Sequence, residues 1–403
     1  MGKNPAIAVV GTFDSKGEEH LFLKTCIEER GLPVLTINVG TKTPPTFSPD
    51  IDLYPIIIRD TREDPGNRDQ AIRSALQQGQ DLVRGLYEGG KILGIISAGG
   101  GTGTHLGTGI MSILPLGVPK VMVSTVASRD MSTIVGTKDI TMMHSVVDIL
   151  GVNSISGMVL DKAAGAVCGM VNSKWHSKEE KKRVALSFFG FITPAAEHVK
   201  LCLEGMGYEV IPFHANGTGG MAMEELAAEG YFQGILDLAT HEFADDLLDG
   251  YCGGIGPERL EPVLDREIPR LVVPGGMDCA VLEFTRDDIP DPFRDRKIFF
   301  YDFRSAIRLN MDETRFLASQ MAEKLNKGGK SNKVLIPIGG WSEADRIDGP
   351  LYDPKISEAF ISKLKQDLNN EIEVREANLH INDPLFAKLA SEIMDEMIQE
   401  KSG

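Results

Sequence analysis

Glycine and threonine residues crowd one short stretch of the sequence, IISAGGGTGTHLGTG at residues 95–109. An apolar run ends there before a helical run begins, and glycines in such a turn allow positive φ and let backbone N–H groups face a ligand. The N-terminus of the following helix adds partial positive charge and the threonine hydroxyls add donors, so phosphate is the expected guest. The predicted cradle consists of Gly99, Gly100, Gly101, Thr102, Gly103 and Thr104.

This stretch matches neither of two familiar phosphate-binding motifs. No Gly-Lys-Ser/Thr follows, as a Walker A loop requires, and Gly101, Gly103 and Gly107 form G-x-G-x-x-x-G rather than the Rossmann G-x-G-x-x-G. A tight strand-to-helix turn without a ligand is the alternative interpretation. Phosphate binding is favoured because four glycines between residues 99 and 103 exceed what one turn requires.

Two further polar loops follow apolar runs in the first half of the chain. In GTFDSKGEE (11–19), hydroxyls of Thr12 and Ser15 can bind phosphate or ribose, Asp14 can bind Mg²⁺ or a ribose hydroxyl, and Lys16 can neutralise charge. Helix capping by Asp14 or Ser15 explains that loop equally well. The second loop, VSTVASRDMSTIVGTKDI (123–140), fits a lid or wall of a nucleotide pocket and begins with the polar residues Ser124 and Thr125.

The second half of the chain supplies the candidate catalytic residues His214, His241 and Glu242. His214 follows an apolar run in PFHANGTGGMAMEE, where it could act as a general acid or base or, equally well, bond to the backbone of a turn. His241 and Asp245 are spaced i, i+4 in LDLATHEFADD and can share a helix face, but two ligands are too few to define a metal site.

The elements that must position these residues alternate between β-rich and helical runs. Runs buried on both faces and joined by helices predict an α/β fold with two doubly wound, Rossmann-like parallel-sheet domains, residues 1–175 and 176–403. A helix at 154–173, rich in small residues, is expected to pack across a domain or subunit boundary. The predicted strands cover 6–11, 33–40, 54–59, 92–99 and 119–125, then 183–190, 209–217, 234–240, 270–276, 297–303, 333–340 and 372–378.

Composition limits the partners and the compartment. The 403 residues include 42 basic and 58 acidic side chains, a formal charge of −16, which disfavours nucleic acid and anionic membranes as partners. A small anion would need a local site built from backbone amides. Five widely spaced cysteines and the lack of a signal-peptide or membrane-span pattern predict reduced thiols in a cytoplasmic protein.

Together these stretches resemble the ATP-binding N-terminal domain family of the tomato mosaic virus resistance protein, over nearly the whole chain. The most specific segments are VGTFDSKGEE, the glycine stretch, LPLGVPKVMVSTVAS, FHANGTGGMAMEEL and HINDPLFA. The resemblance implies two α/β subdomains, ATP bound in the first, and a homodimer. It places ATP binding on Gly11, Thr12, Phe13, Asp14, Ser15, Lys16, on the cradle at residues 99–104, and on Ser124 and Thr125.

The resemblance is weaker in two segments. DFRSAIRLNMDE and GGWSEADRIDGPLYDP depart from the family pattern, so no substrate chemistry is carried over to the second domain. The antiviral role of the plant protein is not carried over either, because its further C-terminal domain has no counterpart in this sequence.

The leading hypothesis is therefore an ATP-binding protein that acts, as an ATP-dependent enzyme, on an unknown small molecule in a cleft between the domains. Lys16 and Mg²⁺ would offset the phosphate charge. One alternative is a non-catalytic nucleotide sensor or scaffold dimer. Another is a metabolic enzyme that uses a different phosphorylated ligand or a nicotinamide cofactor, which is disfavoured because the second β-rich run ends INVGTK without an acidic residue for the ribose.

Overall fold

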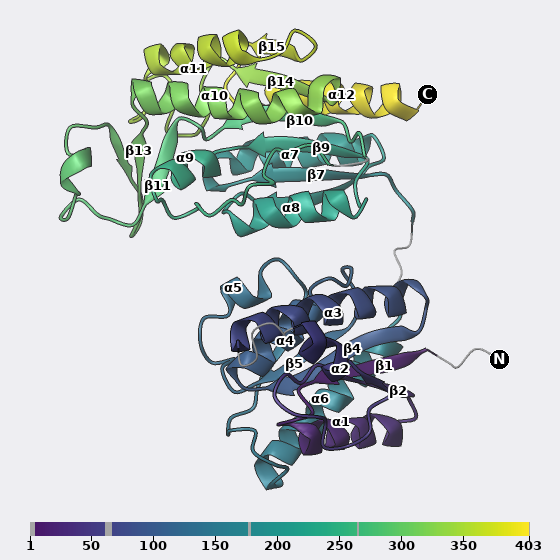
Figure 1. Ribbon diagram of the computed structural model, residues 1–403. Helices are drawn as coiled ribbons and strands as arrows, with labels where there is room; N and C mark the ends of the chain where they lie inside the picture. The colour runs from purple at the N-terminus through teal and green to yellow at the C-terminus, as the bar shows by residue number, and fades with distance from the viewer. Residues whose placement is uncertain (1–4, 61–66, 176–178, 264–265, 403) are drawn as a thin grey trace. The chain divides into compact units, whose positions relative to one another are not determined.

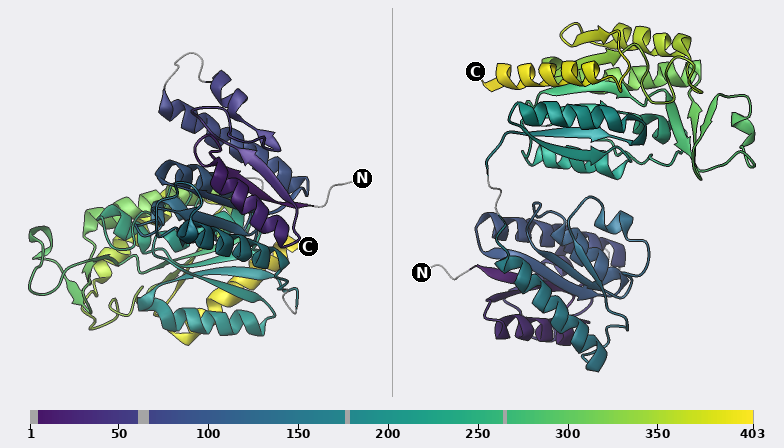
Figure 2. Two further views of the ribbon diagram at one scale, coloured as in Figure 1. Left: turned by 90° about the horizontal axis from the view of Figure 1, so that it is seen from below. Right: turned by 180° about the vertical axis from the view of Figure 1, so that it is seen from behind.

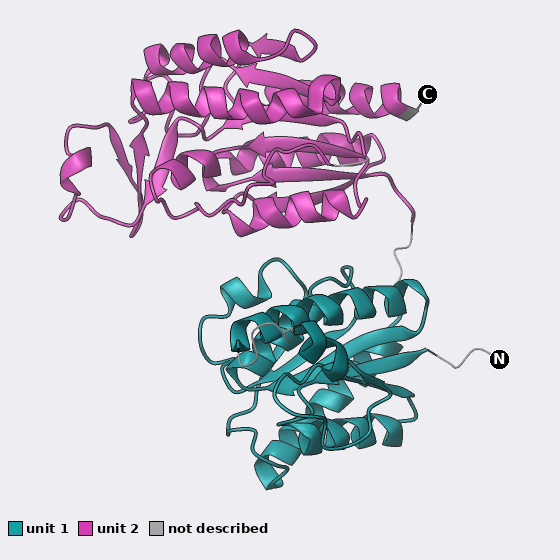
Figure 3. Cartoon of the chain, in the orientation of Figure 1, with its two compact units in different colours: residues 1–176 teal, residues 177–403 magenta. Residues whose placement is uncertain are grey.

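The computed structural model describes residues 5–60, 67–175, 179–263 and 266–402. The chain divides into two compact units, residues 1–176 and 177–403 (Figure 3). Each unit contains its own six-stranded parallel sheet, so the prediction of two doubly wound α/β domains is confirmed.

The sheet of unit 1 has the strand order β3-β2-β1-β4-β5-β6, the Rossmann order (Figure 1). Its direction of winding reverses between β1 and β4, so the carboxyl ends of these two strands flank the crevice in which such sheets bind ligands. The strands are β1 (Ala6–Gly11), β2 (Val34–Asn38), β3 (Ile51–Asp52), β4 (Ile92–Gly99), β5 (Lys120–Ser124) and β6 (Thr141–His144).

Helices cover both faces of this sheet because both faces of its strands are apolar (Figure 2). In β1, Ile7 and Val9 pack with α1 (Gly17–Glu29) and α6 (Ser154–Asn172), whereas Ala8 and Val10 pack on the opposite face. That face is covered by α2 (Tyr54–Asp60), α3 (Arg68–Glu88) and α4 (Gly101–Met111); a short helix, α5 (Ser132–Val135), precedes β6.

Residues 54–59 were predicted as a strand, and this prediction is wrong because they form most of α2. The strand at this place is the two-residue β3, and the Asp52 side chain at its end accepts a hydrogen bond from the N–H of Tyr54 (3.1 Å). A short apolar run such as YPIIIR does not distinguish strand from helix by periodicity, and tertiary packing of Ile57 decides it.

The helix predicted at 154–173 is α6, and its packing across a domain or subunit boundary stays a prediction. Ala163 and Ala164 are fully buried in unit 1, in the layer that α6 forms with α1 over β4 and β5. The small residues therefore let α6 approach its own sheet closely. Among the described helices, α6 is also the one with the length and mean hydropathy (1.2) of a membrane span.

The sheet of unit 2 has the order β15-β14-β10-β9-β7-β8, and here the winding reverses between β7 and β9. This is the flavodoxin-like arrangement, which likewise opens a crevice at the carboxyl ends of the two strands. The strands are β7 (Arg183–Phe188), β8 (Glu209–His214), β9 (Gly234–Ala239), β10 (Arg270–Gly275), β14 (Asn332–Pro337) and β15 (Glu373–Ala377).

Two helical layers cover this sheet as well. On one face, Leu236 and Leu238 of β9 pack with α7 (Thr193–Gly205) and α12 (Pro384–Ser402). The other face carries α8 (Thr218–Ala228), α9 (Glu242–Leu247), α10 (Met311–Gly328) and α11 (Pro354–Asp367). Three single 3₁₀ turns, at Gly190–Ile192, Asp291–Phe293 and Gly329–Ser331, complete the described helical segments.

Residues 297–303 were predicted as a strand of the second parallel sheet, and this assignment is wrong. They contribute β12 (Ile298–Phe300) to a separate antiparallel sheet with β11 (Cys279–Leu282) and β13 (Ser305–Arg308), in the order β11-β13-β12. Figure 1 shows this sheet at one end of the unit 2 parallel sheet. The β-rich composition of KIFFYDF predicts a strand but carries no information about its partner.

Candidate functional site

The three loops that the sequence analysis singled out in the first half leave neighbouring strands of unit 1 at the same edge. β1 ends at Gly11 and β4 ends at Gly99, and these strands flank the reversal of the sheet. Ser124 of β5 lies directly beside Gly99 in the β4–β5 register, and the Thr125 N–H donates to the Gly99 carbonyl (3.1 Å). Parallel strands thus gather segments that are far apart in the sequence.

Several glycines of this edge are required by packing within the protein. A Cβ on Gly11 would lie 2.0 Å from the imidazole of His20, and a Cβ on Gly99 would lie 2.8 Å from the Cα of Gly103. A Cβ on Gly107 would lie 2.7 Å from the Ser97 hydroxyl. These residues are glycine because another part of unit 1 comes too close for any side chain.

Gly100 and Gly101 have no such reason to be glycine. A Cβ on Gly101 would meet no atom within 4 Å, and one on Gly100 would meet only the Thr125 hydroxyl, at 3.7 Å. Backbone conformation does not require glycine there either, because none of the glycines from Gly99 to Gly109, all of them described, has positive φ. The bare backbone at these two positions therefore faces open space rather than a protein neighbour.

Helix α4 begins at this open space without a side-chain cap. Gly100 is the N-cap and has no side chain to accept from the first-turn amides of the helix. The Thr102 hydroxyl accepts a hydrogen bond from the guanidinium of Arg68 (3.0 Å), the first residue of α3. Arg68 could not be identified from local sequence, because nothing near it signals that the start of α3 lies against the start of α4.

Thr104 and Ser124 are buried and bonded to one another. Their hydroxyl oxygens lie 2.7 Å apart, and the Ser124 hydroxyl also accepts from the N–H of Val126 (3.1 Å). In the structure these two hydroxyls hold α4 to β5. The part of the cradle left open is therefore the backbone of residues 100–103.

The loop after β1 is shaped by Asp14. One carboxylate oxygen of Asp14 accepts hydrogen bonds from the N–H groups of Thr41 (3.1 Å) and Lys42 (2.9 Å), and the other is buried without a partner. The N-cap of α1 is Lys16, with no side-chain cap bond, so neither Asp14 nor Ser15 caps the helix. An unpartnered, buried carboxylate oxygen fits a Mg²⁺ ligand.

The other residues of this loop have protein partners. The Ser15 hydroxyl lies 3.2 Å from the hydroxyl of Thr12. The Phe13 side chain is buried, stacks on Phe47 with ring centroids 4.7 Å apart, and is part of the core. The Lys16 ammonium donates to the carbonyl of Ile149.

In unit 2, His241 is fully buried and stacks on Phe189, with ring centroids 3.8 Å apart and planes inclined by 13°. Among the residues that the structure describes, neither ring nitrogen has a hydrogen-bond partner. Burial lowers the pKa of His241 to about 3, with a smaller contribution from the nearby His214, so the imidazole is neutral. His214 itself is exposed at the end of β8, and partial burial of its ring followed by the charge of Arg304 lowers its pKa.

Glu242 belongs to a buried ionic network that the sequence analysis did not foresee. Arg259 donates from Nε to Glu242 (2.6 Å) and through both terminal nitrogens to Asp237 (2.5 and 2.6 Å). Arg270 donates to both oxygens of Glu224 (2.7 and 2.5 Å). Burial is the main cause that raises the pKa of Glu242 to about 7.

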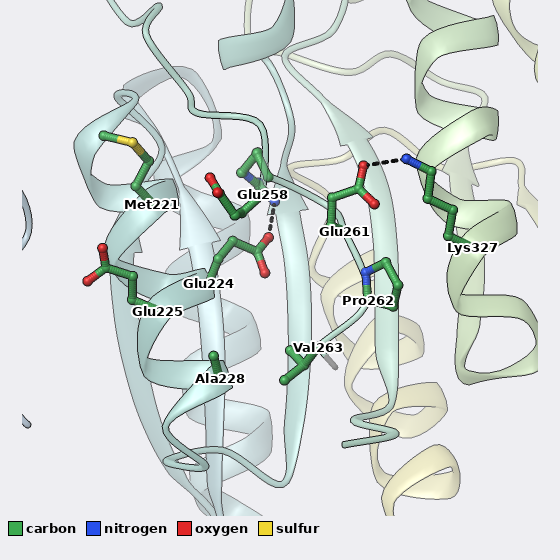
Figure 4. Close-up of a pocket in the computed structure, with 10 residues that line it drawn as sticks. Met221, Glu224, Glu225, Ala228, Glu258, Glu261, Pro262, Val263 and Lys327 are labelled. Atoms are coloured by element: carbon green, nitrogen blue, oxygen red, sulfur yellow. Dashed lines mark hydrogen bonds and ion pairs between the residues drawn. The ribbon is translucent and has the colours of Figure 1, made fainter. Parts of the chain in front are cut away.

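A cavity of about 640 Å³ opens beside this network (Figure 4). Glu224 and Arg259 form part of its wall, and Lys327 of α10 pairs with Glu261 (2.8 Å) at its rim. The cavity is lined from α8, residues 258–263 and α10, whereas the candidate residues His214 and His241 are not among its lining residues. The cavity therefore lies beside the ionic network and does not include the candidate residues His214 and His241.

Taken together, the fold and these sites define a two-unit Rossmann-like α/β protein with an uncapped helix N-terminus at the switch point of its first sheet. The chain belongs to the uncharacterised protein family UPF0261, because the N-terminal domain model of that family matches residues 5–176 and the C-terminal domain model matches residues 181–398.

The relatives agree with this assignment. A UPF0261 protein of Clostridium tetani is 37% identical over 392 residues, which cover 95% of this chain and 96% of that protein. The ToMV resistance protein Tm-1(GCR237) of Solanum lycopersicum is 37% identical over 305 residues, covering 73% of this chain but 40% of the tomato protein. A solved UDP-N-acetylglucosamine 2-epimerase aligns over 99% of this chain and 97% of its own with 10% identity and a TM-score of 0.25, too low for any further argument.

Proposed function

We propose that unit 1 binds ATP, with the phosphates on the backbone amides of residues 100–103 at the start of α4. The observation that carries this proposal is that Gly100 and Gly101 face open space, although no contact or backbone conformation in the protein requires glycine there. A phosphate resting on the backbone would require it, because any side chain would occupy the position of the ligand.

The surroundings supply a favourable electrostatic environment. The uncapped first turn of α4 carries the partial positive charge of the helix, and Arg68 adds a full charge beside Thr102. These local charges act at short range, where the formal charge of −16 of the whole chain matters less. If Mg²⁺ accompanies the nucleotide, the unpartnered oxygen of Asp14 would hold it, and the ion would neutralise phosphate charge.

The end of β2 favours a mononucleotide over a dinucleotide. Asn38 stands where the Rossmann pattern places the acidic residue that binds a ribose. Its side-chain oxygen already accepts from the N–H groups of Phe13 (3.0 Å) and Gly40 (3.0 Å), and its side-chain nitrogen donates to Asp52 (2.7 Å). The resemblance to an ATP-binding family agrees with this preference. A second substrate in a cleft between the domains stays a prediction.

Calorimetric titration of the full chain with ATP and Mg²⁺ tests the proposal. Gly101→Val should weaken ATP binding by at least about tenfold, roughly 1.4 kcal/mol, because its side chain enters space that the protein leaves empty. Gly85→Val is the matched control, since Gly85 lies exposed in α3 with nothing within 4 Å of an added Cβ. Equal affinity of both variants for ATP, or no binding by the unmodified chain, would overturn the assignment.

Turnover separates an ATP-dependent enzyme from a nucleotide sensor. Phosphate release from ATP in the presence of small metabolites would establish an enzyme. Binding of ATP without any product across the same metabolites would favour the sensor or scaffold. Tighter binding of NAD⁺ than of ATP would instead identify the loop as a dinucleotide site.

A further inference from the structure

Three potential metal ligands of different chemical types meet at the end of β9 in unit 2. His241 precedes α9, Asp245 lies one turn later on α9, and Cys252 follows in the next loop. One ligand atom of each lies within 4.8 Å of those of the other two, and all three side chains are buried. We refer to these three residues as the His-Asp-Cys cluster.

His241 supplies an independent sign that something is bound. Its side chain is 0% exposed, yet both imidazole nitrogens lack a hydrogen-bond partner within the described residues. A buried polar group without a partner is costly, and native proteins rarely tolerate one without a reason. Coordination of an ion by a ring nitrogen would satisfy it.

The His241 ring is also held in one orientation. Phe189 stacks on it, and Gly276 packs beside both, where an added Cβ would lie 2.4 Å from the Phe189 ring and 2.7 Å from the Cβ of His241. Gly276 has a φ of +72°, a conformation that further favours glycine. Packing thus fixes the plane of the His241 imidazole, although its ring nitrogens form no hydrogen bond within the described residues.

Asp245 is oriented by backbone amides, as metal-bound carboxylates commonly are. One oxygen accepts from the N–H of Cys252 (2.8 Å) and the other from the N–H of Val281 (2.8 Å). The first of these bonds also brings Cys252 next to the carboxylate. Each oxygen keeps a lone pair for an ion.

We propose that the His-Asp-Cys cluster is a zinc site with three protein ligands. Imidazole, thiolate and carboxylate are the ligand types that Zn²⁺ prefers, whereas Mg²⁺ and Ca²⁺ prefer oxygen ligands throughout. On binding, the Cys252 thiol releases its proton to solvent, so the thiolate and the carboxylate balance the double charge of the ion. A neutral set suits a fully buried position.

The cluster needs a small adjustment to close around the ion. Ligand atoms around a tetrahedral zinc lie roughly 3.5 Å apart, given bonds of about 2.0–2.3 Å. Because the three ligand atoms lie within 4.8 Å of one another, each pair must approach by at most about 1.3 Å, which side-chain rotation can supply. Three protein ligands leave the fourth position to water or to a substrate, an arrangement found in catalytic zinc sites.

Metal analysis of the full-length protein tests this proposal directly. After treatment with a chelator and dialysis, the chain should take up one equivalent of Zn²⁺. Substitution by Co²⁺ should produce a near-ultraviolet band from charge transfer between sulfur and cobalt. That band reports a thiolate ligand in the unmodified protein, so the test does not depend on whether a variant folds.

Variants identify the ligands. Cys252→Ser should abolish the charge-transfer band and weaken zinc binding at least tenfold, and His241→Gln should weaken zinc binding to a similar extent. Cys202→Ser should change neither, because Cys202 lies on α7 outside the cluster. No zinc uptake by the folded protein, or equal zinc affinity in Cys252→Ser and Cys202→Ser proteins of native circular dichroism, would overturn the proposal. ATP binding by unit 1 is measured separately and does not depend on this outcome.

Discussion

His20 and His241 are both fully buried, but the protein uses the two imidazoles in different ways. His20 donates or accepts at both nitrogens, with Nδ1 2.6 Å from the carbonyl of Lys16 and Nε2 accepting from the N–H of Ala98 (3.3 Å). The bond to Ala98 connects α1 to β4, next to the glycine cradle. His241 makes no such bond. The hydrogen bonds of His20 stabilise the fold, whereas the unsatisfied nitrogens of His241 support the zinc proposal.

The burial of His20 predicts that unit 1 loses stability in acid. Burial lowers its pKa from 6.5 to about 4, so the folded state favours the neutral ring. The stabilisation is complete above pH 6.5 and is lost as the pH falls towards 4, because the unfolded chain binds the proton first. The expected loss in the free energy of unfolding of unit 1 is about 3 kcal/mol.

Hydrogen exchange of β4 peptides in urea, followed between pH 7 and pH 4, measures this loss. His20→Gln should remove this part of the pH dependence, even if it lowers stability at every pH. His105→Gln is the control, because His105 is exposed on α4. An unchanged acid slope in His20→Gln would show that another group is responsible.

At the scale of elements, α4 combines glycines of two kinds. Gly107 faces β4 and β5, where an added Cβ would lie 2.7 Å from the Ser97 hydroxyl and 2.9 Å from the Met122 sulfur. Gly101 faces open space at the start of the same helix. Gly107 therefore allows α4 to pack closely on the sheet, whereas Gly101 keeps the N-terminus of the helix open.

Gly107→Ala should destabilise unit 1 by about 1–3 kcal/mol, because the methyl group overpacks the contact between α4 and the sheet. Gly101→Ala should leave stability unchanged or raise it slightly, since alanine favours the helix and the new methyl group meets nothing. Urea denaturation of both variants measures the difference. Equal stability of the two proteins would mean that the sheet yields to the added methyl group at no cost.

Element type was predictable from the sequence where a run is long or both of its faces are apolar. The predicted ranges 6–11 and 92–99 coincide with β1 and β4, and the helix predicted at 154–173 coincides with α6. Both errors fall in short apolar runs: the element type is wrong at residues 54–59, whereas residues 297–303 contain a strand, as expected, but in a different sheet. Their local pattern is compatible with more than one partner, and the partner decides the element.

At the scale of the whole molecule, each unit has its own cores. The buried clusters of unit 1 contain residues of unit 1 alone, and those of unit 2 contain residues of unit 2 alone. Arg259 has a special place in unit 2, because it pairs with three carboxylates that come from α8, β9 and α9. Removing it would leave Glu242 buried without its counterion and would leave Asp237 with only the longer ion pair to Arg270 (3.4 Å).

Arg259→Met should therefore lower the free energy of unfolding of unit 2 by about 3–5 kcal/mol. Hydrogen exchange in urea, resolved by peptide, should show this loss in β9 and β10 and little change in β1 and β4. Arg294→Met should cost less than about 1 kcal/mol, because its ion pair with Asp291 is exposed. An equal loss in both units would contradict independent cores.

The candidate site of unit 1 could be located from local sequence, because a glycine stretch between an apolar run and a helical run specifies its own turn. Its chemistry depends on neighbours that local sequence does not contain. Arg68 reaches Thr102 across 34 positions, and the packing that explains Gly11, Gly99 and Gly107 involves other elements. These contacts separate Gly11, Gly99 and Gly107, which packing requires to be glycine, from Gly100, Gly101 and Gly103, where an added Cβ would meet no atom closer than 3.7 Å.

In unit 2 the difference between what local sequence predicts and what only the folded structure determines is larger. The types of most strands and helices follow from apolar periodicity, which is a property of consecutive residues. The pairing of Arg259 with Glu224 and the approach of Cys252 to Asp245 follow from strand order and from the path of the loops. The local hydrophobic pattern determines which residues are buried. Only the assembled sheet determines which buried polar groups contact one another, because these contacts join segments that are far apart in the sequence.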